Sequence, residues 1–242
     1  CVASRVCASR PRSCLPMSLL ASFKKTPPKG GLNSSEMIRS VQKSPALATE
    51  TDPDTKNTLL HFACCNGAPL ALVKALLAAN PAAATAKDGE GNLPIMGAVA
   101  NGCEADVIKA LLRANPESVR ARQGEHTLLH QAACNGQSVE TVELLLKAWP
   151  GAAAERDREG NAPLHFAAGC QAPAAVVKAL LAACPEAASW RGQMQRYPLS
   201  LCLLCESTPE AVQAIRDAHP DAQRAFELVA DYQNHGMGVS GP

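Results

Sequence analysis

Five prolines recur at nearly constant spacing along this chain of 242 residues: Pro81, Pro116, Pro150, Pro185 and Pro220. Successive members of this set are 35, 34, 35 and 35 residues apart. A fixed period of this size is typical of repeat proteins, in which each unit packs only against its neighbours. The period therefore predicts an elongated array rather than a globular domain built around one central core.

The repeated unit contains two short helices. In its first copy, NTLLHFACCNGAPLALVKALLAANP (57–81), Leu60, Ala63 and Cys64 share one face of a helix that Asn66-Gly67 should end. A second helix is predicted from about residue 70 to residue 79, with Pro81 stopping it. A projecting loop should then occupy residues 82–91. Helices this short cannot bury a core alone, so the fold must depend on stacking between repeats.

The period also divides the chain into segments. We expect a basic flexible arm or targeting-like segment (1–33), a repeat array (34–232) and a disordered tail (233–242). Within the array we expect a half-repeat cap (34–56), five repeats and a C-terminal cap helix (221–232), since arrays need capping units that hide their apolar ends. The five repeats span residues 57–91, 92–125, 126–160, 161–195 and 196–220.

Charge is distributed unevenly along the chain. Residues 1–33 carry six basic residues and no acidic ones, whereas the remaining residues carry 17 basic and 22 acidic ones. An arm of this composition resembles an organellar transit peptide or a basic binding arm. No apolar run approaches the roughly 20 residues that a membrane-spanning helix needs. Because the array is acidic, nucleic-acid binding is disfavoured.

Short motifs within the repeats resemble those of ankyrin repeats. Thr58–His61 and Thr127–His130 (TLLH in both) and Ala162–His165 (APLH) are similar to the Thr-Pro-Leu-His signature of that family. Leu72–Leu77 (LVKALL) and Val176–Leu181 (VVKALL) look like its second helix, and the Asp-x-x-Gly sequences at 88–91 and 157–160 look like its turn. The resemblance implies an all-α, ankyrin-like helical solenoid with projecting loops. Met96 and Ser200 replace the signature histidine in repeats two and five.

Two histidine–cysteine pairs lie one helical turn apart, His61 with Cys65 and His130 with Cys134. Such pairs could act as nucleophile and base, or as zinc ligands. The resemblance implies a different role, in which Thr58, His61, Thr127, His130 and His165 are structural residues that fasten each repeat. We favour the structural role, because buried cysteine is usually an inert apolar residue and a catalytic site is seldom repeated.

The sequence Cys202-Leu-Leu-Cys205 is a C-x-x-C motif, which can be redox-active or form half of a zinc site. No second such pair accompanies it at zinc-finger spacing. We therefore favour packing within the first helix of repeat five, and a redox role stays open. The sequence predicts no metal and no cofactor.

Charged residues recur at fixed positions in the loops. Lys87, Arg122, Arg156 and Arg191 occupy one position in four consecutive repeats, and Glu90, Glu125 and Glu159 occupy another. Stacking should align each set in a row along the loop edge. Either the two rows pair with each other in solvent, or the basic row contributes to a partner-binding surface.

The loop of repeat four departs from the others, because no acidic residue follows Arg191 there. It reads Ser189-Trp-Arg-Gly-Gln-Met-Gln195, and Trp190, Arg191, Gln193 and Met194 form our candidate binding site. An exposed tryptophan beside an unpaired arginine has the composition of a binding hot spot. The alternative is that Trp190 folds back to cover the adjoining repeat.

No phosphate-binding loop, nucleophile elbow or kinase motif occurs, which argues against an enzyme. The sequence predicts a non-enzymatic protein-binding module or scaffold that uses the loops and the concave helix face, with a protein partner and no small-molecule substrate. The alternative is a permanently bound subunit of a larger, possibly organellar complex anchored by residues 1–33. The eleven cysteines are odd in number, and several occupy equivalent positions of the repeat, as Cys65 and Cys134 do. This favours apolar packing in a reducing compartment, either cytosol or nucleus, or an organelle interior if residues 1–33 are a targeting segment.

Overall fold

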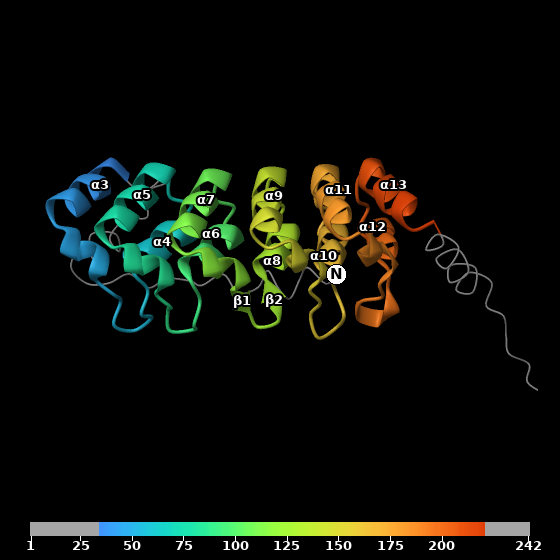
Figure 1. Ribbon diagram of the computed structural model, residues 1–242, viewed down its shortest axis with the longest axis horizontal. Helices are drawn as coiled ribbons and strands as arrows, with labels where there is room; N and C mark the ends of the chain where they lie inside the picture. The colour runs from blue at the N-terminus through green and yellow to red at the C-terminus, as the bar shows by residue number, and fades with distance from the viewer. Residues whose placement is uncertain (1–33, 221–242) are drawn as a thin grey trace, which may run out of the picture.

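The computed structural model describes residues 34–220, which form a single row of stacked helix pairs (Figure 1). The predicted all-α solenoid is confirmed, and one short two-stranded ribbon accompanies it. The α-helices are α3 (Ser34–Lys43), α4 (Leu59–Cys65), α5 (Leu70–Ala79), α6 (Pro94–Ala100), α7 (Ala105–Ala114), α8 (Leu128–Cys134), α9 (Val139–Ala148), α10 (Pro163–Gly169), α11 (Ala174–Ala183), α12 (Pro198–Leu204) and α13 (Pro209–Ala218). The predicted arm (1–33), cap helix (221–232) and tail (233–242) lie outside the described residues.

The first full repeat shows how the sequence sets the helix ends. The Thr58 hydroxyl accepts the main-chain N–H of His61 and so caps the start of α4. The helix ends at Cys65 with Asn66 as its C-cap, and Gly67 follows with a φ of +66°, a left-handed conformation that glycine adopts without strain. The second helix, α5, has the predicted bounds. Pro81 lies just beyond its last residue.

The prediction that an irregular loop begins directly after each helix-ending proline is wrong for the first four residues after the proline. A single turn of 3₁₀-helix begins at each of the helix-ending prolines up to Pro185. Proline favours the first position of such a turn, because its φ is already helical and its missing N–H needs no partner there. The 3₁₀-helices are η1 (Pro45–Thr49), η2 (Pro81–Thr85), η3 (Pro116–Arg120), η4 (Pro150–Ala154), η5 (Pro185–Ser189) and, within the last loop, η6 (Gln193–Gln195).

The helices form two layers, and the loops project from one edge (Figure 1). The first helices of the repeats, α4, α6, α8, α10 and α12, pack side by side in one layer, and α3, α5, α7, α9, α11 and α13 pack in the other. The loop between repeats two and three forms an antiparallel ribbon of β1 (Arg122–Gln123) and β2 (His126–Thr127). The loops therefore line up along the edge nearest the first helices.

One equivalent position in every repeat forms the centre of the core. Its side chain is an aliphatic residue in the first helix, at most 2% exposed in each case. The five residues are Leu60, Ile95, Leu129, Leu164 and Leu199. Because each packs between neighbouring repeats, burial is continuous along the array, as a solenoid requires.

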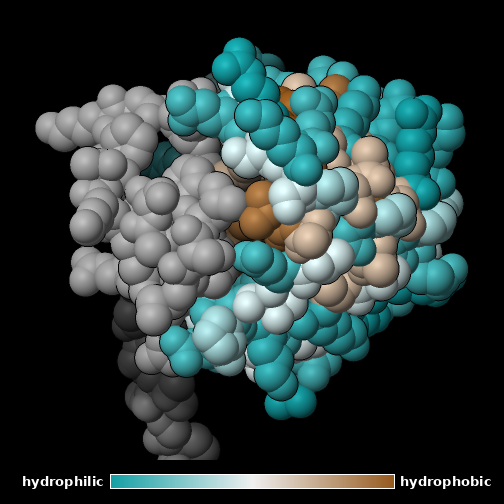
Figure 2. Space-filling view, turned by 90° about the vertical axis from the view of Figure 1, so that its left-hand side faces the viewer, coloured by the Kyte–Doolittle hydropathy of each residue, from teal (hydrophilic) through white to brown (hydrophobic). Residues whose placement is uncertain are grey.

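Helix α3 covers the free end of the second-helix layer. It packs on α5 through the buried Met37 and Val41, while Glu36, Arg39 and Lys43 are exposed. Viewed from this end, the surface is largely hydrophilic around a smaller hydrophobic area (Figure 2). This polar outer face is what a terminal cap needs. Within residues 34–220, no helix is long and apolar enough to cross a membrane.

Candidate functional site

The three signature histidines join each repeat to the next loop. In His61, Nδ1 accepts the Thr58 N–H at 3.1 Å, so Nε2 carries the proton and donates to the Asn92 carbonyl at 3.1 Å. The same two bonds recur at the other two positions: His130 bonds Thr127 and Asn161, and His165 bonds Ala162 and Trp190. Each of these histidines thus links the start of its own first helix to the loop that follows the repeat.

Burial holds these histidines in the neutral form. It lowers the pKa of His61 and lowers the pKa of both His130 and His165 to about 4, and hydrogen bonds to main-chain carbonyls oppose this effect in part. A neutral imidazole with both nitrogens bonded to the backbone is not available for proton transfer. In repeat two Met96 takes the histidine's place, and its sulfur lies 3.3 Å from the Leu93 N–H.

The cysteines differ from one another in environment. Cys202 is fully buried and burial raises its pKa, which is the opposite of what a reactive thiol needs. The sequence reasoning missed a different pair, Cys134 and Cys170, whose sulfurs lie 2.8 Å apart at the ends of α8 and α10. A hydrogen bond from Cys170 lowers the pKa of Cys134. Among residues 34–220, no group of three or more side chains is placed to hold a metal ion.

The predicted pairing between the two charged rows is wrong. Arg122 pairs with Glu155, which lies outside the acidic row, and Arg158 pairs with Glu125 at 3.0 Å. Both pairs join neighbouring loops, since the two partners are 33 positions apart in the sequence. All four side chains are partly or fully exposed, so each pair contributes at most about 1 kcal/mol. Lys87 is exposed at the far end of the basic row.

Trp190 and Arg191 are not the exposed tryptophan and unpaired arginine of the prediction. Trp190 is half-buried, and the Arg156 guanidinium lies 5.2 Å from its ring centre. Arg191 lies over the Tyr197 ring at 5.1 Å and donates from Nε to the Tyr197 hydroxyl at 2.9 Å. Both arginines therefore have aromatic rather than acidic partners. Their charges are not neutralised by these contacts.

Asn161 positions the last loop. Its buried side-chain oxygen accepts the Gln193 N–H at 2.9 Å, and its side-chain nitrogen donates to Asp157. The loop approaches so closely that a Cβ at Gly192 would overlap the Asn161 side chain. Met194 follows with a φ of +56° and is 76% exposed. The loop thus presents an apolar side chain to solvent at a fixed place.

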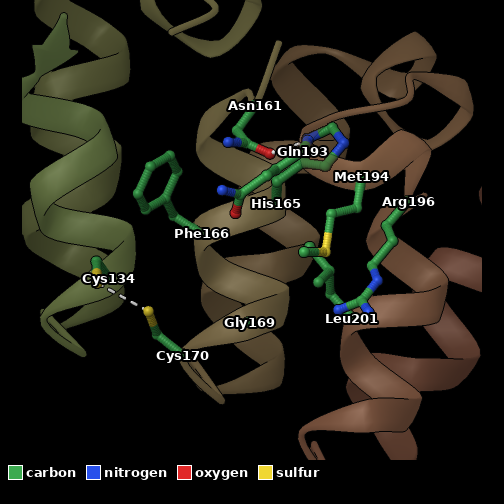
Figure 3. Close-up of a pocket in the computed structure, with 10 residues that line it drawn as sticks. All are labelled: Cys134, Asn161, His165, Phe166, Gly169, Cys170, Gln193, Met194, Arg196 and Leu201. Atoms are coloured by element: carbon green, nitrogen blue, oxygen red, sulfur yellow. Dashed lines mark hydrogen bonds between the residues drawn. The ribbon is translucent and has the colours of Figure 1, made fainter. Parts of the chain in front are cut away.

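A pocket lies beside this loop, between α8, α10 and α12 (Figure 3). Its empty volume is about 450 Å³, counting the mouth that is open to solvent. In the figure, Phe166 and the two thiols lie on one side of Gly169, and Met194, Leu201 and Arg196 lie on the other. The sequence reasoning predicted Gln193 and Met194, which border the pocket, but missed Phe166, Gly169 and Arg196. The signal for Gly169 was its departure from the other repeats, which have a side chain at that position.

Two family models match this chain. A model of three ankyrin repeats matches residues 95–189, and a model of one ankyrin repeat matches residues 55–87. Together the two matched ranges cover more than half of the 242 residues. No curated protein matches the chain in sequence.

Proposed function

The chain belongs to the ankyrin repeat family, and we propose from this that it is a non-enzymatic module that binds a protein partner through its loop edge and the exposed face of its first helices. Ankyrin repeats are generally protein–protein interaction modules, and proteins that contain them are typically not enzymes. The fold alone does not select the binding face, so the proposal depends on particular residues.

One observation carries the choice of face. Within residues 34–220, the large hydrophobic side chains that are exposed are Met194, at 76%, and Leu204, at 55%. Both belong to the last two repeats, Met194 in the loop and Leu204 at the end of α12. Single exposed apolar residues are common, but Met194 also lines an apolar pocket that Arg196 lines with it. Apolar anchors next to arginines are typical of binding hot spots.

The test is a loss of affinity in a variant that changes only exposed side chains. Replacing both Arg191 and Met194 (Arg191→Ala, Met194→Ser) should weaken partner binding by tenfold or more, while the free energy of unfolding changes little. The partner is first captured with the full chain from native extract, purified, and then measured by calorimetry. The matched control is the double variant Lys109→Ala, Arg113→Ala, which changes two exposed side chains of α7 in the second helix layer and should leave affinity nearly unchanged. Equal affinity of the double variant and the unmodified chain would remove this face from consideration.

A second function is favoured by the charge segregation in the sequence. The six basic residues of 1–33 suit a permanently bound subunit of a larger assembly that is anchored by this segment. In that case residues 1–33 should resist added protease within the native complex, and their removal should release the chain. Rapid cleavage of residues 1–33 within an intact complex would contradict this second function.

A further inference from the structure

The pocket between α8, α10 and α12 is lined by Gly169, and repeat four is the repeat that has glycine at this position of the first helix. The equivalent residues in the other repeats are Cys65, Ala100, Cys134 and Leu204. A Cβ built at Gly169 would meet no atom within 4 Å, and its φ lies outside the left-handed region. Neither a close approach nor the backbone conformation therefore requires glycine here.

The walls of this pocket suit a flexible apolar group. Phe166 and Leu201 contribute apolar surface from two neighbouring first helices, and Met194 borders the space from the loop. Methionine is unbranched and polarizable, so Met194 can adjust its conformation to an occupant. The enclosed space has room for about one water molecule, so an occupant must lie mainly in the open mouth of the pocket beside Met194. One flexible side chain of a peptide suits such a shallow site better than a ring system does.

The pocket itself is lined by one basic side chain and no acidic one, while the carboxylates of Asp157 and Glu159 are bonded to the amide of Asn161, which also lines it. Arg196 is the charged residue that lines the pocket, and among residues 34–220 its guanidinium has no ion-pair or hydrogen-bond partner. Arg156 and Arg191 lie on the adjoining loop edge and keep their charges, because their partners are aromatic rings and neutral oxygens. No carboxylate lines the pocket. An occupant with an acidic residue near its apolar side chain would complement this rim.

The geometry points to a specific recognition site: we propose that the pocket at Gly169 takes one methionine or leucine side chain from a partner segment, and that Arg196 pairs with an aspartate or glutamate next to it. This inference rests on the proposed protein-binding function and adds the chemistry of the partner. The inference concerns one pocket, next to the first helix of repeat four, and not the whole concave face through which ankyrin repeats bind partners.

The experiment selects peptides from a random 12-residue library displayed on phage, using the full chain under reducing conditions. Selected peptides should share a methionine or leucine with an acidic neighbour. Synthetic copies are then measured against three variants whose unfolding curves are recorded in parallel. Gly169→Leu fills the pocket and should weaken binding at least tenfold. Ala100→Leu makes the same kind of change at the equivalent exposed position of repeat two and should change affinity less than twofold. Arg196→Gln should weaken binding about tenfold and remove the preference for the acidic residue.

The outcomes separate this proposal from the one on which it rests. If the selected peptides bind the Gly169→Leu variant with the same affinity as the unmodified chain, the proposed pocket site is wrong. It is also wrong if the library yields no binding peptide. If a natural partner is nevertheless captured and is sensitive to Arg191 and Met194, the binding function stands while the pocket fails. If Arg196→Gln leaves the sequence preference unchanged, the assignment of the acidic residue is wrong.

Discussion

Lowering the pH from 7 to 5 should reduce the free energy of unfolding by about 4 kcal/mol through His130 and His165 alone, about 2 kcal/mol from each. Burial lowers the pKa of both side chains to about 4, whereas an unfolded histidine titrates near its ordinary value of 6.5. The unfolded chain therefore takes up protons first as the pH falls, and stability is lost between about pH 6.5 and pH 4. His61, whose pKa burial also lowers, adds to the loss in the same direction.

Urea unfolding followed by circular dichroism at pH 7, 6 and 5 measures this loss. The range stops at pH 5 because most carboxylates remain ionised there. The variant His130→Gln should be less stable than the unmodified chain at pH 7 and should lose less stability on acidification, since one of the titrating groups is gone. The same free energy of unfolding at pH 7 and pH 5 would show that these imidazoles are not buried in the neutral form.

Leu164→Ala should lower the free energy of unfolding by about 2–5 kcal/mol. Leu164 is 1% exposed and lies in α10, which packs between α8 and α12. Its truncation leaves a cavity at two interfaces between repeats, and stacking across these interfaces is what stabilises the array. The measurement is again urea unfolding at pH 7.

The matched control for this substitution is Leu204→Ala, which removes the same atoms from a side chain that is 55% exposed. Exposed truncations of this kind usually change stability by less than about 0.5 kcal/mol. Similar losses for the two variants would contradict the assignment of the equivalent leucine row as the core. A loss confined to Leu164→Ala would support it.

The fold could be predicted from the sequence because the same pattern of apolar residues, turn residues and prolines recurs in each repeat. One copy of Asn66-Gly67 before an apolar run is a weak turn signal, but Asn-Gly recurs at the same position in three of the five repeats, and the aligned repeats identify helix, turn and helix. The bounds of α5 followed directly from this pattern. The 3₁₀ turns that begin at the prolines could not be predicted in the same way. Proline ends one helix and also favours the first position of a new turn, and the sequence alone does not show whether a turn or an extended loop follows it.

The candidate site was predicted only in part, for a reason that lies in the period itself. Equivalent residues lie in rows, so the row of Lys87, Arg122, Arg156 and Arg191 could be read from the sequence. Which side chains pair across the rows depends on the geometry between neighbouring loops, and Arg122 and Arg158 found partners one repeat away. Tyr197 was not expected to neighbour Arg191, because the loop of repeat four folds in a way no other copy shares. Positions where one repeat differs from the others are candidates for a binding site. The contacts that their side chains make can be determined only from the structure.

The measurement that tests the central claim most directly is hydrogen–deuterium exchange of the full chain with and without its captured partner. We predict slower exchange on binding in residues 190–196 and in α10 and α12, which border the pocket, and no change in α9, α11 and α13. Protection confined to that second layer of helices would place the binding surface on the opposite face and would contradict the account.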